Sequence, residues 1–498
     1  MAPNDRRRVS IIVVGIAIVA TILLVLHFSR LRGGSSFSFF LDFNAFYCGG
    51  QVVALRADPY HVQPLLDCED KYPRLEAARG IAIPAPLPGY DFVPLAMISR
   101  LPYETARFCA LGVMLVSCVV LVVAAAGIAR CSVWAVAAML APILYNSINI
   151  GQSPPILAAS MIALAAFLMA RRYYVWAAVA CCAAMCEPHM ALPSYLAALI
   201  WVPRCRLPLV AGGLTLALLS VAAIGLPANL EYFDRVLPTH SLIEVHHPDQ
   251  YSLTWILGYF GVPDQLAVLL GTLSYVAMLA VGLLIARRYA ARFGTPEAYV
   301  LLPAVSAMLA GPFVHLFQIG GAIPGCLWLV NRWRASTPSV VVILIVLAMP
   351  WIAMTDWHFV GAKFLGFLSW MIVLALFAAW ELAPQWRDRH AAIKFAAVTA
   401  ALIALLGAGI HAIPTRVVPP LASAGPRKLQ ESALASSSYA AFVAKMSRQN
   451  SDQTFWAKVP TWLALSFFVA LPLCVTYQQK LADFRDADLD HSRPQGLW

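Results

Sequence analysis

Charged residues are scarce in this chain. Asp, Glu, Lys and Arg make up 12% of its 498 residues, whereas soluble domains carry roughly 25%. Hydrophobic residues make up 61%, and the mean hydropathy is +0.73. This composition excludes a soluble globular protein, because too few polar groups are present to cover the surface of a chain this long. We predict an all-α, polytopic transmembrane helical bundle.

Apolar runs long enough to cross a bilayer, roughly 17–25 residues each, recur along most of the chain. We expect about 12–14 spans together with short interfacial helices. The candidate segments are 10–28, 105–128, 133–149, 153–170, 174–187, 189–202, 207–226, 264–286, 297–310, 313–330, 338–355, 361–380, 392–413 and 460–477. Two of them, 174–187 and 189–202, are short for independent crossings and could instead form one broken helix or a re-entrant pair. The first apolar run, Ile11 to Phe28, is too long for a signal-peptide core and lacks a small-residue cleavage site, which predicts an uncleaved anchor.

Positive charge is absent from the short loops on one side of the predicted bundle. The short loops on the other side, together with the N-terminus, hold Arg6, Arg7, Arg8, Arg130, Arg171, Arg172, Arg204, Arg206, Arg287, Arg288, Arg292, Arg332, Arg334, Arg387, Arg389 and Lys394. Enrichment in Lys and Arg marks cytoplasmic loops, so we predict cytoplasmic N- and C-termini in a multi-pass protein of the cytoplasmic membrane. The net charge of +10 then reflects topology and attraction to membrane lipids. No nucleic-acid partner is expected, because no basic patch is interleaved with aromatics in a polar region.

The middles of the predicted spans lack ionisable residues. Ion-coupled transporters usually carry such residues near the bilayer midplane, so their absence favours an enzyme that works at the outer face. Polar residues collect instead in three long outer segments, 29–104, 227–263 and 414–459. We divide the chain into a catalytic core, 1–413, an outer C-terminal loop, 414–459, and a last span with a cytoplasmic tail, 460–498.

The first outer segment, 29–104, contains features of its own. Its stretches Phe43–Ala57 and Leu65–Arg79 could form short helices lying at the interface. It also contains Cys48 and Cys68, which pair if the outer compartment is oxidising and otherwise stay reduced.

Asp42 is the first candidate for chemistry. It follows the first apolar run among Phe43, Phe46 and Tyr47, where lipid gives way to water. A carboxylate there suits a base that acts on a lipid-linked substrate, and the aromatics can stack on a sugar. The alternative is a solvated residue or a helix cap.

Further polar residues stand at breaks in the apolar pattern. Gln152 opens a span after Gly151, where a turn and cap is the alternative role. Glu187 and His189 flank Pro188 at a helix break, and bonding to the backbone is the alternative there. His315 follows Pro312 in an otherwise apolar helix, where a lone His more often bonds the backbone than acts on substrate. The sequence His246-His247-Pro248-Asp249 reads as a loop, because no metal-binding His or Cys spacing accompanies it.

The order of these motifs resembles that of glycosyltransferase family 87, over roughly residues 38–335. The motifs are Leu41-Asp42-Phe43 with Tyr47, Ala57-Asp58-Pro59-Tyr60, Phe92-Val93-Pro94-Leu95, Asn149-Ile150-Gly151-Gln152, Glu187-Pro188-His189 and Gly311-Pro312-Phe313-Val314-His315. The family comprises multi-span enzymes of the GT-C class and includes alpha-mannosyltransferases. The resemblance implies inverting transfer of a sugar, mannose or similar, from a polyprenyl-phosphate-linked donor to a lipid or glycan acceptor on the outer face.

The resemblance also implies residue roles. Asp42 matches the catalytic base, His315 a histidine near the reaction centre, and Gln152 a residue at the head of a span. The candidates for binding donor phosphate or substrate are His315, Gln152, His189, Glu187, Tyr47, Asp58 and Tyr60, with Arg56 and Lys363 as further possible cations. No cofactor and no metal ligands are expected, although a divalent metal bridging Glu187 and the phosphate is an alternative.

The chain departs from the family pattern at two motifs. Glu187 stands where the family usually has Lys, so an ionised carboxylate would repel the donor phosphate, and Phe313-Val314 replace the usual Ser-Trp-like pair. Two other functions therefore stay open. One is a transporter or flippase for lipid-linked glycans, and the other is a scaffold subunit that has lost its catalytic activity.

Overall fold

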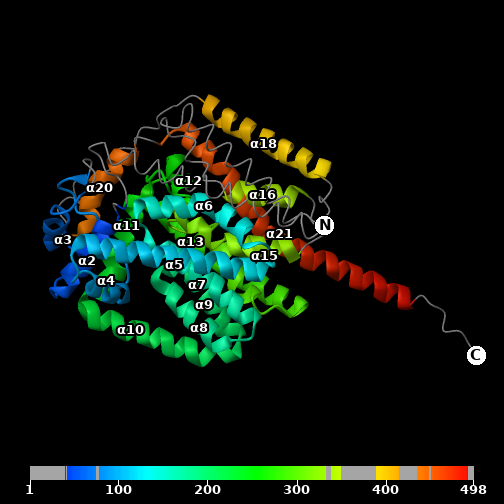
Figure 1. The fold of residues 1–498 in the computed structure, drawn as a ribbon, viewed down its shortest axis with the longest axis horizontal. Helices are drawn as coiled ribbons and strands as arrows, with labels where there is room; N and C mark the ends of the chain where they lie inside the picture. The colour runs from blue at the N-terminus through cyan, green and yellow to red at the C-terminus, as the bar shows by residue number, and fades with distance from the viewer. Residues whose placement is uncertain are drawn as a thin grey trace, which may run out of the picture.

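The computed structural model describes residues 40, 42–73, 78–332, 338–348, 389–413, 434–447 and 450–491. Over these ranges the chain is helical, with two isolated β-bridges and no strand. The predicted all-α bundle is thereby confirmed (Figure 1). The predicted spans 10–28 and 361–380 lie outside the described residues.

Six helices of the described part are long and apolar enough to cross a membrane. They are α5 (Tyr103–Ala129), α6 (Val133–Ile150), α7 (Ser153–Ala170), the run Pro203–Glu244 that contains α10 (Pro203–Glu231) and α11 (Leu237–Glu244), α13 (Asp264–Phe293), and Asp452–Tyr477 of α21 (Asp452–His491). The prediction of a multi-pass membrane protein agrees with these helices. The expected number of spans stays a prediction.

Shorter helices lie between these long ones. They are α8 (Tyr174–Ala183), η3 (Ala184–Cys186), α9 (Pro188–Trp201), α12 (Leu253–Tyr259), α14 (Ala298–Ala307), α15 (Ile323–Arg332) and α16 (Pro338–Ala348). A further helix, α18 (Arg389–Ala412), lies along the outer edge of the molecule in Figure 1. The break between η3 and α9 falls at Glu187, whose backbone is not helical (φ −130°, ψ 81°). A residue before proline is biased away from the helical region, so Pro188 ends one helix and begins the next.

The predicted span 313–330 is wrong as a single helix. Gly311 has φ +145°, a conformation that L side chains rarely adopt, and Pro312 follows it. The chain runs extended to His315 (φ −84°, ψ 158°), and a 3-10 turn, η5 (Leu316–Gly321), precedes α15. His315 therefore lies in an extended segment and not inside a helix.

The C-terminal region also differs from the predicted boundaries. Within the predicted outer loop 414–459 the structure forms α20 (Ala435–Met446), and α21 begins at Asp452, before the predicted span 460–477. Both additions matter for the site, because α20 packs on α11 and α21 packs on α13.

The first outer segment folds into α2 (Phe43–Ala54), α3 (Val62–Glu69), η2 (Gly89–Asp91) and α4 (Phe92–Ile98). A disulfide joins Cys48 on α2 to Cys68 on α3, with their Cα atoms 5.6 Å apart. Of the two alternatives that the sequence left open, paired or reduced cysteines, the structure has the pair. Helix α2 packs closely on α4, since a Cβ on Gly50 would meet the backbone of Leu95. In Figure 1 these helices gather with α20 at one end of the bundle, where η2 and α4 contact α10.

Candidate functional site

Asp42 is held at the junction of three helices. Asp42 directly precedes α2, and its backbone N–H donates to the carbonyl of Ile150 at the end of α6 (2.9 Å). Gln152, which precedes α7, donates from Nε2 to Asp42 Oδ2 at 2.6 Å. The Asp42 side chain does not cap its own helix. The Asp42 side chain is therefore not a helix cap. The fold brings Asp42 and Gln152, two predicted site residues far apart in sequence, into hydrogen-bond contact.

The turn between α6 and α7 explains the Gly-Gln pair. Gly151 has φ +86° and a Cβ there would lie 3.2 Å from the backbone of Phe40. Only glycine combines this backbone conformation with so close an approach. The tight turn sets Gln152 beside Asp42.

Burial raises the pKa of Asp42 to about 6. The hydrogen bond from Gln152 and the charge of His247 act in the opposite direction, while Asp249 and Glu244 add to the rise. A carboxylate with a pKa near neutrality suits general-base catalysis. The same interactions show that the segment around Glu244 and His247 lies near Asp42.

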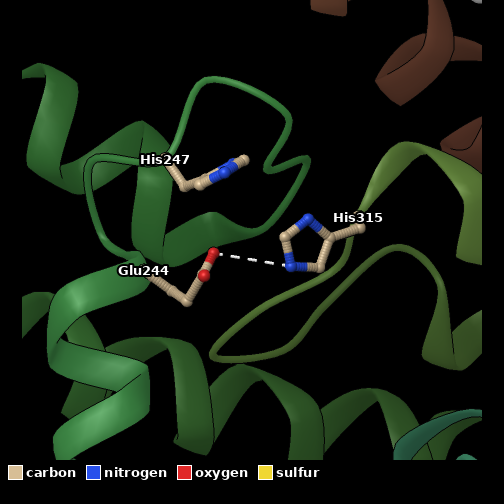
Figure 2. Close-up of side chains that lie close together, drawn as sticks. All are labelled: Glu244, His247 and His315. Carbon is tan, nitrogen blue, oxygen red and sulfur yellow. Dashed lines mark ion pairs between the residues drawn. The ribbon is translucent and has the colours of Figure 1, made fainter. Parts of the chain in front are cut away.

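A second group consists of Glu244, His247 and His315. Glu244 ends α11 and is 2% exposed, His247 lies in the following loop, and His315 precedes η5. Glu244 Oε2 and His315 Nε2 are 3.4 Å apart, and one ligand atom of each of the three residues lies within 4.8 Å of the others. Figure 2 shows the carboxylate and both rings turned toward a common space.

Gln250 orients this group. Its Oε1 accepts a hydrogen bond from the N–H of Val314 (2.8 Å), and its Nε2 donates to Glu244 Oε2 (2.7 Å) and lies 3.2 Å from His315 Nε2. Burial lowers the pKa of His315 to about 4, so the ring is neutral at pH 7. The amide nitrogen of Gln250 is a donor, so its contact with His315 Nε2 is a hydrogen bond when the ring proton is on Nδ1.

Lys458 of α21 fixes the loop that carries Gln250. Its side chain is completely buried, Nζ donates to the carbonyl of Gln250 at 2.6 Å and lies 3.2 Å from the ring centre of Trp255. Trp462, one turn further along α21, donates to the carbonyl of Tyr251 at 2.8 Å. The C-terminal helix therefore supports the site, a role that the sequence did not reveal because Lys458 fell in a predicted loop.

Glu187 and His189 connect to His315 through Gln318. Gln318 donates to Glu187 Oε1 (3.0 Å) and accepts the N–H of His315 (2.7 Å), while His189 Nδ1 lies 3.3 Å from Glu187 Oε1. Burial raises the pKa of Glu187 to about 8, against the effect of the Gln318 hydrogen bond. At pH 7 this carboxyl is mostly protonated. The repulsion of a phosphate expected from the sequence assumed an ionised Glu187, and burial removes that charge.

Three predicted residues take part in packing the first outer segment. Tyr47 donates from its hydroxyl to the carbonyl of Leu101 (2.9 Å), and Tyr60 donates to the carbonyl of Leu87 (2.7 Å). Asp58 Oδ1 accepts the N–H of Tyr60 at 2.8 Å. These bonds hold the segment together, with Tyr47 and Tyr60 buried in its interior and Asp58 partly exposed beside His61.

The two predicted cations have different positions. Arg56 is exposed just after α2, and Lys363 lies outside the described residues.

The site residues that the sequence did not predict are Glu244, Gln250, Gln318 and Lys458. Two of these are uncharged amides and the others lie in segments of ordinary loop composition, so only the fold identifies them.

No protein-family model, curated protein or solved structure matches this chain. Its function is therefore argued from the site. The site offers the Asp42 carboxylate, whose pKa is close to neutrality, amide donors from Gln152, Gln250 and Gln318, and imidazoles around a buried glutamate.

Proposed function

We propose that this protein is a membrane glycosyltransferase. It moves a sugar, mannose or similar, from a polyprenyl-phosphate donor to a lipid or glycan acceptor at the outer face of the cytoplasmic membrane. The observation that carries the proposal is the Asp42–Gln152 pair, in which a carboxylate with a raised pKa is positioned by a side-chain donor at the mouth of α7. The order of the motifs over residues 38–335, which resembles that of glycosyltransferase family 87, also supports the proposal.

The reaction needs one carboxylate. Gln152 binds Oδ2 of Asp42, which leaves Oδ1 to accept the proton of the acceptor hydroxyl at a distance of about 2.6–3.2 Å. The hydroxyl oxygen then forms a bond to the anomeric carbon, while the bond from that carbon to the phosphate oxygen breaks on the opposite face. The products are the inverted glycoside and polyprenyl phosphate, which leaves as an anion and needs no acid.

The leaving phosphate needs nearby donors or positive charge. The group of His189, Glu187 and His315 is suited to this task, because protonated Glu187 supplies an O–H donor and no repelling charge at pH 7. This arrangement explains how a glutamate can replace the lysine of the family pattern.

The distribution of charge favours chemistry over ion-coupled transport. The helices α6 and α7 carry no charged side chain, and those of α5 and α13 lie near the helix ends, as do Glu104 and Arg107 in α5 and Arg287 and Arg292 in α13. Transporters that couple to ions place such groups near the midplane. The polar groups of this chain instead meet where helices end.

The test is transfer by the purified protein in proteoliposomes. The liposomes contain radiolabelled short-chain polyprenyl-phosphate mannose and an envelope lipid extract as acceptor. We expect label in a new lipid or glycan product whose anomeric configuration is opposite to that of the donor. Movement of intact donor across the bilayer without a new bond would support the flippase instead, and binding without turnover would support the scaffold.

A further inference from the structure

We propose that Glu244, His247 and His315 bind one divalent transition-metal ion, with Zn²⁺ as the best fit. Two imidazoles and one glutamate are the ligand set of zinc sites that keep an open coordination position. The sequence predicted a plain loop at His247, because the other two ligands come from the end of α11 and from the segment before η5. Only the fold brings them together (Figure 2).

The distances suit a small tetrahedral centre. Ligands bound at roughly 2.0–2.1 Å to zinc lie about 3.4 Å from one another, and Glu244 Oε2 and His315 Nε2 are 3.4 Å apart. The third ligand, from His247, lies within 4.8 Å of both. A small movement of the His247 side chain completes the set.

The amide of Gln250 faces both candidate ligand atoms, with its Nε2 2.7 Å from Glu244 Oε2 and 3.2 Å from His315 Nε2. An N–H donated to His315 uses the single lone pair on Nε2, and metal ligation requires that same lone pair. A metal on Nε2 therefore replaces this weak contact, whereas Glu244 Oε2 has a second lone pair that can keep the bond from Gln250.

His247 must likewise exchange one weak contact to take part. Its Nδ1 accepts the N–H of Asp249 at 3.2 Å. Coordination through either ring nitrogen ends this hydrogen bond, because a metal on Nδ1 takes the same lone pair and a metal on Nε2 leaves a proton on Nδ1. The loop at 245–249 is therefore the part of the site that adjusts on binding.

A buried carboxylate also needs a counter-charge. Glu244 is 2% exposed, and beside His315 and Gln250 it has His240, whose Nε2 is 3.7 Å from Oε1. The ion pairs of Glu244 in the described chain are thus with imidazoles, which carry charge only when protonated. A divalent cation neutralises the carboxylate, and the histidines remain neutral ligands.

The ligand types decide between metals. Imidazole suits Zn²⁺ and its neighbours, whereas Mg²⁺ and Ca²⁺ prefer oxygen ligands. Three protein ligands leave one tetrahedral position for an anionic oxygen, and a donor phosphate has the required chemistry. This role of the ion rests on the proposed transferase function, but the existence of the metal site does not.

Metal binding is tested on the full chain, purified in detergent and dialysed against a chelator. We expect native protein to take up one Zn²⁺ per chain from ZnCl₂, measured by elemental analysis after desalting, and to prefer Zn²⁺ to Mg²⁺. X-ray absorption at the zinc edge should show nitrogen and oxygen neighbours at about 2.0–2.1 Å, two of them imidazoles. His247→Gln should lower the affinity by at least about 10-fold.

His246→Gln is the matched control. His246 is adjacent in sequence, but its Nε2 lies 2.9 Å from Asp264 Oδ1 and it does not belong to the group. The His246→Gln variant should bind Zn²⁺ with the same affinity as the native protein. His315→Gln provides a second variant in case His247→Gln fails to fold. Absence of stoichiometric Zn²⁺ in the native protein, or unchanged affinity in folded His247→Gln and His315→Gln, overturns the metal site. Zinc bound with no effect on transfer would refute only its role in the reaction.

Discussion

Replacing Asp42 by Asn should separate the chemical role of this carboxylate from its effect on stability. Burial holds the folded pKa of Asp42 near 6, against an ordinary value of 3.8. The native state therefore binds more protons than the unfolded state between these two pH values, and its stability falls as pH rises through this window. The full penalty is present above pH 6 and absent below pH 3.8.

The size of that penalty follows from the shift. A difference of about 2 pKa units corresponds to roughly 3 kcal/mol, since one unit is about 1.36 kcal/mol. Gln152 already lowers the pKa, so its hydrogen bond is included in this figure. Asn is uncharged and can still accept from Gln152. We expect Asp42→Asn to be more stable than the native protein by up to about 3 kcal/mol at pH 8, and equally stable near pH 4.

The same substitution should abolish most of the transfer. General-base catalysis contributes about 10²–10⁴-fold, which is roughly 3–5 kcal/mol of activation free energy. The proteoliposome assay measures the rate, and thermal unfolding in detergent, followed by tryptophan fluorescence at pH 8 and pH 4, measures the stability. Asp67→Asn is the matched control, because Asp67 is an exposed carboxylate of the same outer segment and should change neither quantity. Native transfer rates in folded Asp42→Asn would show that Asp42 is not the base. Unchanged stability at pH 8 would refute the inference that ionised Asp42 destabilises the folded protein.

Three further predictions concern its neighbours. Gln152→Ala removes the largest contribution that lowers the pKa of Asp42, so the acidic limb of the kcat/KM profile should move to higher pH, and an unmoved limb would contradict the contact. Glu187→Gln should match native stability near pH 4 and exceed it at pH 9, because burial raises the pKa of Glu187 from 4.5 to about 8; a variant less stable at pH 9 would show that the carboxyl is not neutralised as inferred. The double variant Cys48→Ser, Cys68→Ser should lose about 3 kcal/mol of unfolding free energy, as expected for a loop of this length, and thiol labelling of the native protein without reductant should leave both cysteines unmodified.

Much of the fold was readable from hydropathy alone. The segments 105–128, 133–149 and 153–170 became α5, α6 and α7 with ends shifted by few residues, because a long apolar run must form a helix to satisfy its backbone in lipid. The segment 313–330 failed, since Gly311 and Pro312 interrupt a helix without changing the hydropathy. Hydropathy measures polarity, whereas this break is a matter of backbone conformation.

The sequence determined the class of the protein, the place of Asp42 after an apolar run, and the order of the motifs that contain Asp42 and Gln152. Composition and local backbone preferences are properties of short segments, so they can be read without the fold. The tertiary structure decided everything that depends on burial and on distant partners. It neutralised Glu187, gave Asp42 its raised pKa, brought Glu244, His247 and His315 together, and placed Lys458 beneath their loop. Desolvation and contact across hundreds of residues arise only when the helices pack.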